Sequence, residues 1–328
     1  MKKYLIGKND SGLRLDRFLS KALPGIPPAL MYKYIRTNHV KLNGRKPKID
    51  VRLCAGDIVE LYIRDEFFAV DEKRYDFAGA KRELDVVYED EHLLVADKPP
   101  GLLSHPGVEY TADTLIARIT RYLYEKGEYS PDAENSFAPA LVNRLDRNTA
   151  GLIIAAKNAE SLRLLNDKMK NREVRKFYLC AVIGAPARKE NILLGWLKKD
   201  EKNNKVTVYG ESRDGCKEIK TAYKVLAQGA GLSLLEVELL TGRTHQIRAH
   251  LAAAGLPLLG DSKYCPRALF NRYGYKKQLL VSYRLLFDFK TDAGILSYLN
   301  GKSLQSKDVW FADSFPSRVL ERPAKDAG

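Results

Sequence analysis

The chain has 328 residues, 45% of them hydrophobic and 29% charged, which predicts a globular protein large enough for two domains. No apolar stretch approaches the roughly 20 residues that span a bilayer, and the N-terminus lacks the apolar core of a signal peptide, so we expect a cytoplasmic protein that binds no membrane. The formal net charge is +14 and the pI near 9.4, which favours a polyanionic partner such as nucleic acid, although a merely basic soluble protein has the same balance.

The cysteines and histidines show neither a disulfide pattern nor a metal-binding pattern. Cys54, Cys180, Cys216 and Cys265 are scattered, without a CxxC pair and without a histidine at metal-ligand spacing. Disulfide-bonded domains and structural zinc sites need such clusters. We therefore expect free thiols and no bound metal.

The first fifth of the chain is a separate, strongly basic segment. Residues 1–64 hold 14 Lys/Arg and 5 Asp/Glu, a net charge of +9. Apolar spacing predicts a helix over 13–23 and a second helix from the prolines at 27–28 to residue 36. Two alternating strands follow, one at 40–45 ending in an Asn-Gly turn and one within 52–63. Charge concentrated in this way predicts a dedicated binding module.

This segment resembles the S4 RNA-binding domain. The resemblance rests on LDRFL at 15–19, YIR at 34–36, VKLNG at 40–44 and AGDIV at 55–59. In that family the second helix and the loop after it contact RNA by shape and phosphate. We assign residues 1–64 to this domain and residues 65–83, which are mixed in charge and without period, to a linker. The residues expected to bind RNA here are Lys33, Arg36, Lys41, Arg45 and Lys46.

The rest of the chain, from residue 84 to about 320, alternates strands and helices. Strands are predicted at 85–89, 93–97, 151–156, 178–183, 205–209, 222–226, 232–240 and 279–285. Helices are predicted at 114–124, at 159–170 and after residue 246. The polar tail 321–328 should be frayed.

One stretch combines dense charge with a buried strand. Arg144, Asp146 and Arg147 lie within four positions and precede the apolar run 151–156. Arginines beside an acid keep it ionised, and a desolvated carboxylate can act as nucleophile or base. The alternative is a structural Arg–Asp pair that orders a loop.

Four segments in order resemble the RluA family of RNA pseudouridine synthases. They are VYEDEHLLVADKPPG at 87–101, NRLDRNTAGL at 143–152, RKFY at 175–178 and TGRTHQIRAHL at 241–251. The family converts uridine in RNA to its carbon-linked isomer without a cofactor. The S4-like segment narrows the resemblance to the branch that acts on large-subunit ribosomal RNA. The implied fold is α+β, with a small S4-like domain followed by a catalytic domain on a mixed, largely antiparallel sheet with flanking helices.

The resemblance also implies roles for individual residues. Asp146 is the catalytic nucleophile or base, and Arg248 pairs with it. Tyr178 packs on the target base, which must be flipped out of the RNA stack to be reached. Arg144 then helps to hold the displaced nucleotide out. The residues expected to bind RNA in this domain are Arg144, Arg243 and His245.

Two positions depart from the family pattern. Asn143 stands where the family usually has histidine, and Ala150 stands where it usually has serine. Neither change touches the implied chemistry, but both could alter how RNA is held.

Several alternatives stay open from the sequence. The chain could be a non-catalytic RNA-binding or ribosome-assembly factor that kept the fold, or it could carry out the same reaction on transfer RNA. Asp146 could attack C1′ of the ribose or remove the 2′ proton. Nothing in the sequence demands a partner subunit, so we expect a monomer bound to 23S ribosomal RNA or its precursor.

Overall fold

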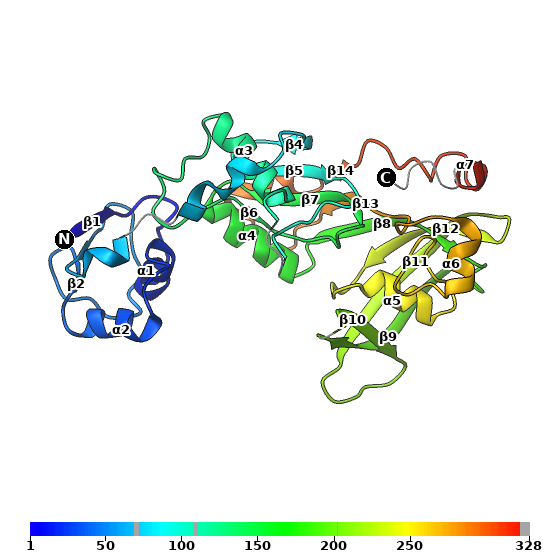
Figure 1. The fold of residues 1–328 in the computed structure, drawn as a ribbon, viewed down its shortest axis with the longest axis horizontal. Coiled ribbons are helices and arrows are strands. Elements are labelled where there is room, and N and C mark those ends of the chain that lie inside the picture. The colour runs from blue at the N-terminus through cyan, green and yellow to red at the C-terminus, as the bar shows by residue number, and fades with distance from the viewer. Residues whose placement is uncertain (69–71, 108–110, 202, 322–328) are drawn as a thin grey trace.

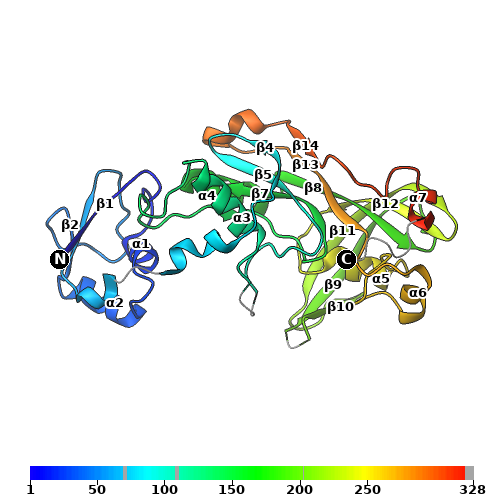
Figure 2. The ribbon, with the colours of Figure 1, turned by 45° about the horizontal axis from the view of Figure 1, so that its top comes forward.

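A computed structural model describes residues 1–68, 72–107, 111–201 and 203–321, and Figures 1 and 2 show it from two directions. The chain is elongated, with the N-terminal unit at one end and the strands β8–β12 at the other (Figure 1). Apart from residue 321, the predicted frayed tail 321–328 lies outside the described residues. Among the described residues, no helix has both the length and the apolar character needed to cross a membrane.

The N-terminal unit, residues 1–64, is a small sheet with two helices. Its strands pair antiparallel in the order β1-β3-β2. Phe18, Leu19 and Ile35 of the helices are buried against Val59 and Leu61 of the sheet. Both predicted helices and both predicted strands are confirmed, whereas the first strand was not predicted. The elements are β1 (Lys2–Leu5), α1 (Leu15–Ala22), α2 (Pro28–Arg36), β2 (Val40–Leu42) and β3 (Ile58–Leu61).

The next segment, residues 65–83, was expected to be a linker. Its described residues include two 3₁₀ helices, η1 (Asp65–Phe68) and η2 (Glu72–Gly79). Nearby, the N-terminal unit is tied to the rest of the chain through the buried Asp10, which accepts a hydrogen bond from the Ser136 hydroxyl at 2.6 Å. Asn135 Nδ2 also donates to the Leu5 carbonyl at 2.8 Å. The domain boundaries at 64 and 84 stay predictions.

The remainder of the chain is built on one large mixed sheet. Its strands run in the order β10-β9-β11-β12-β8-β13-β7-β5-β4, with β14 beside β13 and β6 beside β7. Every pairing is antiparallel except β13 with β7, which confirms the expected mixed, largely antiparallel sheet. The strands are β4 (Asp85–Glu89), β5 (Leu93–Lys98), β6 (Ala140–Leu141), β7 (Ala150–Ala156), β8 (Val174–Ile183), β9 (Glu190–Asp200), β10 (Lys205–Tyr209), β11 (Lys217–Gly229), β12 (Leu232–Leu239), β13 (Leu280–Phe287) and β14 (Ser303–Gln305).

Helices cover both faces of this sheet. Ile153 of β7 faces a core that includes α3 and α5, whereas Leu152 and Ile154 face a core that includes Leu165 of α4. A strand buried on both faces explains the unbroken apolar run at 151–156. The helices are α3 (Leu115–Glu125), α4 (Ala159–Lys170), α5 (Gln246–Ala253), α6 (Arg267–Tyr273), η3 (Gly294–Leu299) and α7 (Ser317–Glu321).

The parallel pairing of β7 with β13 requires a glycine. The two strands pair only at Ala150 with Val281 and at Gly151 with Ser282. Gly151 has φ +110°, and a Cβ atom there would lie 2.3 Å from the Ser282 carbonyl oxygen. No side chain fits at that distance, so Gly151 allows the β6–β7 loop (residues 142–149) to meet the start of β13.

Candidate active site

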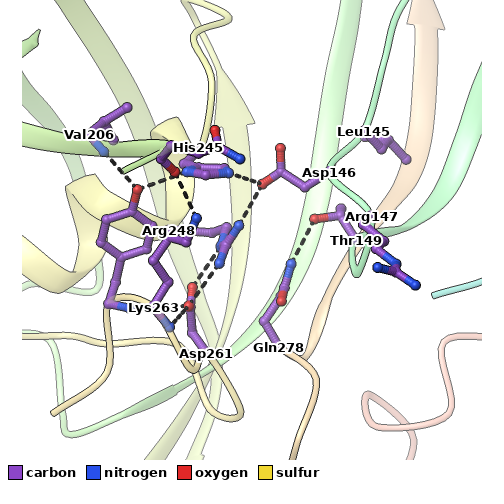
Figure 3. A network of polar contacts seen from close by, with 12 residues as sticks. Leu145, Asp146, Arg147, Thr149, Val206, His245, Arg248, Asp261, Lys263 and Gln278 are labelled. Carbon is purple, nitrogen blue, oxygen red and sulfur yellow. Dashed lines mark hydrogen bonds and ion pairs between the residues drawn. The ribbon is translucent and has the colours of Figure 1, made fainter. Parts of the chain in front are cut away.

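Asp146 lies on the β6–β7 loop, at a point where three segments converge. Its Oδ2 accepts a hydrogen bond from Nη1 of Arg248 at 2.9 Å, and Nε2 of His245 lies 3.8 Å from the same oxygen (Figure 3). Within the described residues, Oδ1 has no hydrogen-bond partner. The side chain is 25% exposed. Asp146 is therefore a carboxylate held through one oxygen, with the other left free.

Arg248 is positioned by a second, fully buried acid. Its Nε donates to Asp261 Oδ2 at 2.7 Å and its Nη2 to Asp261 Oδ1 at 2.9 Å. Bidentate pairing of this kind fixes the plane of a guanidinium. Burial acts to lower the pKa of Arg248, but the bonds to Asp261 and Asp146 outweigh it and raise that pKa. One permanent positive charge is therefore shared between two carboxylates.

His245, which was expected to bind RNA, lies against the same carboxylate. Its imidazole is 8% exposed and its Nδ1 lies 2.8 Å from the Tyr264 hydroxyl. That hydroxyl also accepts the N–H of Val206 on β10 at 3.0 Å. Burial lowers the pKa of His245, so its ring is neutral at neutral pH.

Tyr178 is buried in the core next to the Asp146 loop. It is 4% exposed on β8, is the cross-strand partner of Ser282, and belongs to the same buried cluster as Leu145 and Ile247. Burial raises the pKa of its hydroxyl, which therefore stays protonated. The structure thus brings Tyr178 to the site, while its contact with a base stays a prediction.

Lys98 is a site residue that the sequence reading missed. It is fully buried at the end of β5, and its ammonium donates to the carbonyl oxygens of Pro99, Leu102 and Arg147 at 3.0, 2.8 and 3.0 Å. Burial lowers the pKa of Lys98 to about 7, against the opposing effects of Asp146 and Asp97. Lys98 ties the Asp146 loop to the turn after β5. The sequence feature that could have identified Lys98 is its position directly before the Pro-Pro-Gly turn.

The arginines next to Asp146 in sequence do not clamp it. In the described part of the chain, neither Arg144 nor Arg147 forms an ion pair with Asp146, so a local Arg–Asp pair is not what orders this loop. Arg144 is exposed, and Arg147 is exposed with its Nε donating to the Gly101 carbonyl at 3.1 Å. Arg243, just before α5, is exposed as well.

The remaining predicted residues also have defined places. Asn143, the first departure from the family pattern, is turned toward β7, where its Oδ1 accepts the Ile154 N–H at 2.9 Å. Ala150, the second departure, is the first residue of β7. In the N-terminal unit, Lys41 is half-buried beside Tyr62. The exposed residues of that predicted set are Lys33, Arg36, Arg45 and Lys46.

Comparisons with known proteins agree with this architecture. The family described as RNA pseudouridylate synthase matches residues 92–253. An uncharacterized RNA pseudouridine synthase of Mycoplasma genitalium is 33% identical over 320 residues, which cover 94% of this chain and 97% of that protein. The ribosomal large subunit pseudouridine synthase C of Vibrio parahaemolyticus is 30% identical over 275 residues, covering 82% and 81%.

A solved structure shows that the fold is shared as well. The human RNA pseudouridylate synthase domain containing 4 matches with a TM-score of 0.55 and 20% identity, over 72% of this chain and 92% of that one. The fold and these relatives define an isomerase that acts on RNA. The chain belongs to the RluA family of RNA pseudouridine synthases.

Proposed function

We propose that this enzyme isomerises specific uridines in 23S ribosomal RNA and that Asp146 is its catalytic residue. The observation that carries the proposal is the asymmetric hold on Asp146, with Oδ2 bonded to Arg248 and Oδ1 without a partner among the described residues. The ribosomal substrate is supported by the relative from Vibrio parahaemolyticus, whose name assigns it to the large ribosomal subunit.

The reaction needs an ionised acid beside a detached base. The N1–C1′ bond of uridine breaks, the uracil turns, and C5 bonds to C1′; C5 then loses its proton and N1 gains one. A carboxylate can start this sequence by attacking C1′ or by removing the 2′ proton, and both routes require its charged form. The Arg248 guanidinium lies beside that carboxylate. Tyr178 offers an aromatic face to the base, and stacking of this kind contributes about 1–3 kcal/mol.

RNA must also be held outside the reacting centre. Arg144 is exposed on the loop that carries Asp146, which suits a side chain that keeps a flipped nucleotide out of its stack. Arg243 is exposed at the start of α5. The N-terminal unit, with a net charge of +9 over residues 1–64, acts in this proposal as an S4-like RNA-binding domain, with its exposed basic residues on α2 and the β2 turn. We propose a monomeric, cytoplasmic enzyme with the boundaries 1–64, 65–83 and 84–320.

The role of Asp146 is tested by Asp146→Asn and Asp146→Ala. Both variants should stop pseudouridine formation while RNA binding persists, because the chemistry needs the charge and binding does not. Release of tritium from RNA labelled at C5 of uridine measures turnover directly, since only C5 chemistry frees that label. Asp167→Asn, an exposed change on α4, serves as the matched control and should keep full activity. Turnover by Asp146→Asn would contradict the assignment.

The same assay separates the alternatives. A non-catalytic RNA-binding factor would release no tritium even as the wild type. Mapping of pseudouridines in total RNA from a deletion strain names the substrate. Loss of sites in 23S ribosomal RNA is expected, whereas loss confined to transfer RNA would favour the other substrate.

Tyr178→Phe tests the stacking role. The ring is kept, so RNA affinity in a filter-binding assay should change little. A large loss of affinity would indicate that the hydroxyl itself contacts RNA.

A further inference from the structure

The polar contacts behind Asp146 continue through two side chains whose joint arrangement the sequence did not predict. Nε2 of His245 lies 3.8 Å from Asp146 Oδ2, and Nδ1 of the same ring lies 2.8 Å from the hydroxyl of Tyr264 (Figure 3). The hydroxyl in turn accepts the Val206 N–H at 3.0 Å. The chain of contacts therefore runs from β10 to the catalytic loop.

The donors in this chain select one form of the imidazole. The Val206 N–H can only donate, so it occupies an acceptor site of the Tyr264 oxygen. The Tyr264 O–H is then free to donate to Nδ1 of His245, which leaves the proton on Nε2, facing Asp146. The opposite tautomer would turn a lone pair toward a carboxylate oxygen and leave the tyrosine proton with no acceptor among the described residues.

The surroundings of His245 are consistent with a neutral ring in a fixed orientation. Among the charged groups around it, Asp146 and Asp261 favour the protonated ring, whereas Arg248 and Lys263 disfavour it. The ring packs edge-on against Tyr264, with centroids 5.7 Å apart and planes at 70°. Tyr264 therefore holds the imidazole both by aromatic packing and by a hydrogen bond.

The backbone at His245 is also unusual. The residue precedes α5 in the left-handed conformation, with φ 52°, and its side chain caps no backbone N–H of the helix. A non-glycine residue in this region is strained, and such strain persists where other contacts over-determine the position. Here the imidazole makes those contacts. Its Nδ1 lies against the Tyr264 hydroxyl and its Nε2 faces Asp146.

We propose that Tyr264 and His245 are positioning residues for Asp146. Tyr264 fixes His245 with its proton on Nε2, and His245 and Arg248 together confine Oδ2 so that Oδ1 faces the flipped uridine. The 3.8 Å separation is longer than a hydrogen bond. We expect it to shorten when RNA binds, because hydrogen bonds at catalytic sites are often long in the free enzyme. The proposal rests on the proposed role of Asp146.

The tautomer can be observed without any turnover. In protein labelled with ¹⁵N in the histidine rings, the signals of His245 are identified by their absence from His245→Gln. Near neutral pH we expect a neutral ring protonated on Nε2, and a mixture of tautomers in Tyr264→Phe. A wild-type ring protonated on Nδ1, or on both nitrogens, would overturn the proposal. Because no RNA is present, this result is independent of whether Asp146 is the catalytic residue.

Kinetics test the coupling between the two residues. Tyr264→Phe should lower kcat about 10-fold, the order of one hydrogen bond, and leave KM for RNA unchanged. A glutamine amide reaches the position of Nε2 and an asparagine amide only that of Nδ1, so His245→Gln should retain more activity than His245→Asn. Tyr124→Phe, at an exposed tyrosine of α3, is the control and should leave kcat unchanged.

A double-mutant cycle decides whether Tyr264 acts through His245. Tyr264→Phe should cost little in the His245→Gln background, since glutamine has no tautomer to set. Equal losses in the two backgrounds would show that the residues act independently and would overturn the proposal. Thermal unfolding of each variant separates loss of turnover from loss of fold.

Discussion

Lys98→Met removes the buried amine that joins the Asp146 loop to the turn after β5. Lys98 is fully buried, and three carbonyl oxygens, including that of Arg147, accept its three N–H groups. Methionine keeps a similar volume but leaves those oxygens without this donor. The Arg147 carbonyl still accepts the Gly101 N–H and Pro99 is exposed, so the Leu102 carbonyl is the buried acceptor among the three that loses its donor. An unsatisfied buried group costs about 1–3 kcal/mol, so the variant should lose about that much unfolding free energy at high pH and should turn over slowly.

The pH dependence follows from the lowered pKa of Lys98, about 7 against an ordinary 10.5. Between these values the folded state has lost the proton while the unfolded state still binds it, so the stability of the wild type rises with pH. Below pH 7 Lys98 is charged in both the folded and the unfolded state, and above 10.5 it is neutral in both. Its contribution to the unfolding free energy is therefore constant outside that window. Within it the gain is at most about 1.4 kcal/mol per pH unit, or about 2 kcal/mol from pH 7 to pH 9.

Urea unfolding of wild type and Lys98→Met at both pH values measures this contribution. Groups shared by the two proteins cancel in the difference between their unfolding free energies. We expect the wild type to gain on the variant by about 2 kcal/mol at the higher pH. An unchanged difference would refute the reasoning, because it would mean that the three carbonyl oxygens keep the proton on Lys98 against the effect of burial.

Three further changes test other contacts. Gly151→Ala places a Cβ 2.3 Å from a backbone oxygen of β13, so it should lower the unfolding temperature and abolish tritium release. Asp261→Asn removes the buried partner of Arg248 and should cost about 3–5 kcal/mol in urea unfolding; a neutral effect would show that this pair does not hold the guanidinium. Lys33→Ala combined with Arg36→Ala should weaken RNA binding and reduce the slope of log K against log salt by about 1 to 2, with kcat unchanged at saturating RNA.

Local pattern was sufficient for most elements of the fold. The helices α3 and α4 begin at Thr114 and Asn158, whose side chains accept hydrogen bonds from Ala117 and Ser161 N–H groups, and both were predicted within a residue or two. The lysine-rich strand β9 was not predicted as one element. The exposed face of its first half carries Ile192 and Leu194, the latter 63% accessible, so the sequence lacks the apolar and polar alternation of a half-buried strand.

The candidate site was predictable only where a family motif marked it. Asp146, Tyr178 and Arg248 were named from motifs, and the structure brings them together. Tyr264 lies outside those motifs, and Lys98 lies within one of them without a chemical role that its residue type alone would suggest, because the roles of both depend on contacts made by folding. Tyr264 is 58 positions from Val206, and Lys98 is 49 positions from Arg147. Spacing along the sequence does not predict that these residues are in contact.

The dense charge around Asp146 separates into two functions once the fold is known. The acid is held from the far side by Arg248, which the buried Asp261 keeps in place, so its position does not depend on its sequence neighbours. Arg144 and Arg147 are thereby left exposed on the rim of the same loop, where a polyanion can reach them. If those arginines paired with the acid instead, they would be less available to a polyanion. Because the pairing residue comes from α5, one short loop presents both the carboxylate of Asp146 and two exposed cations.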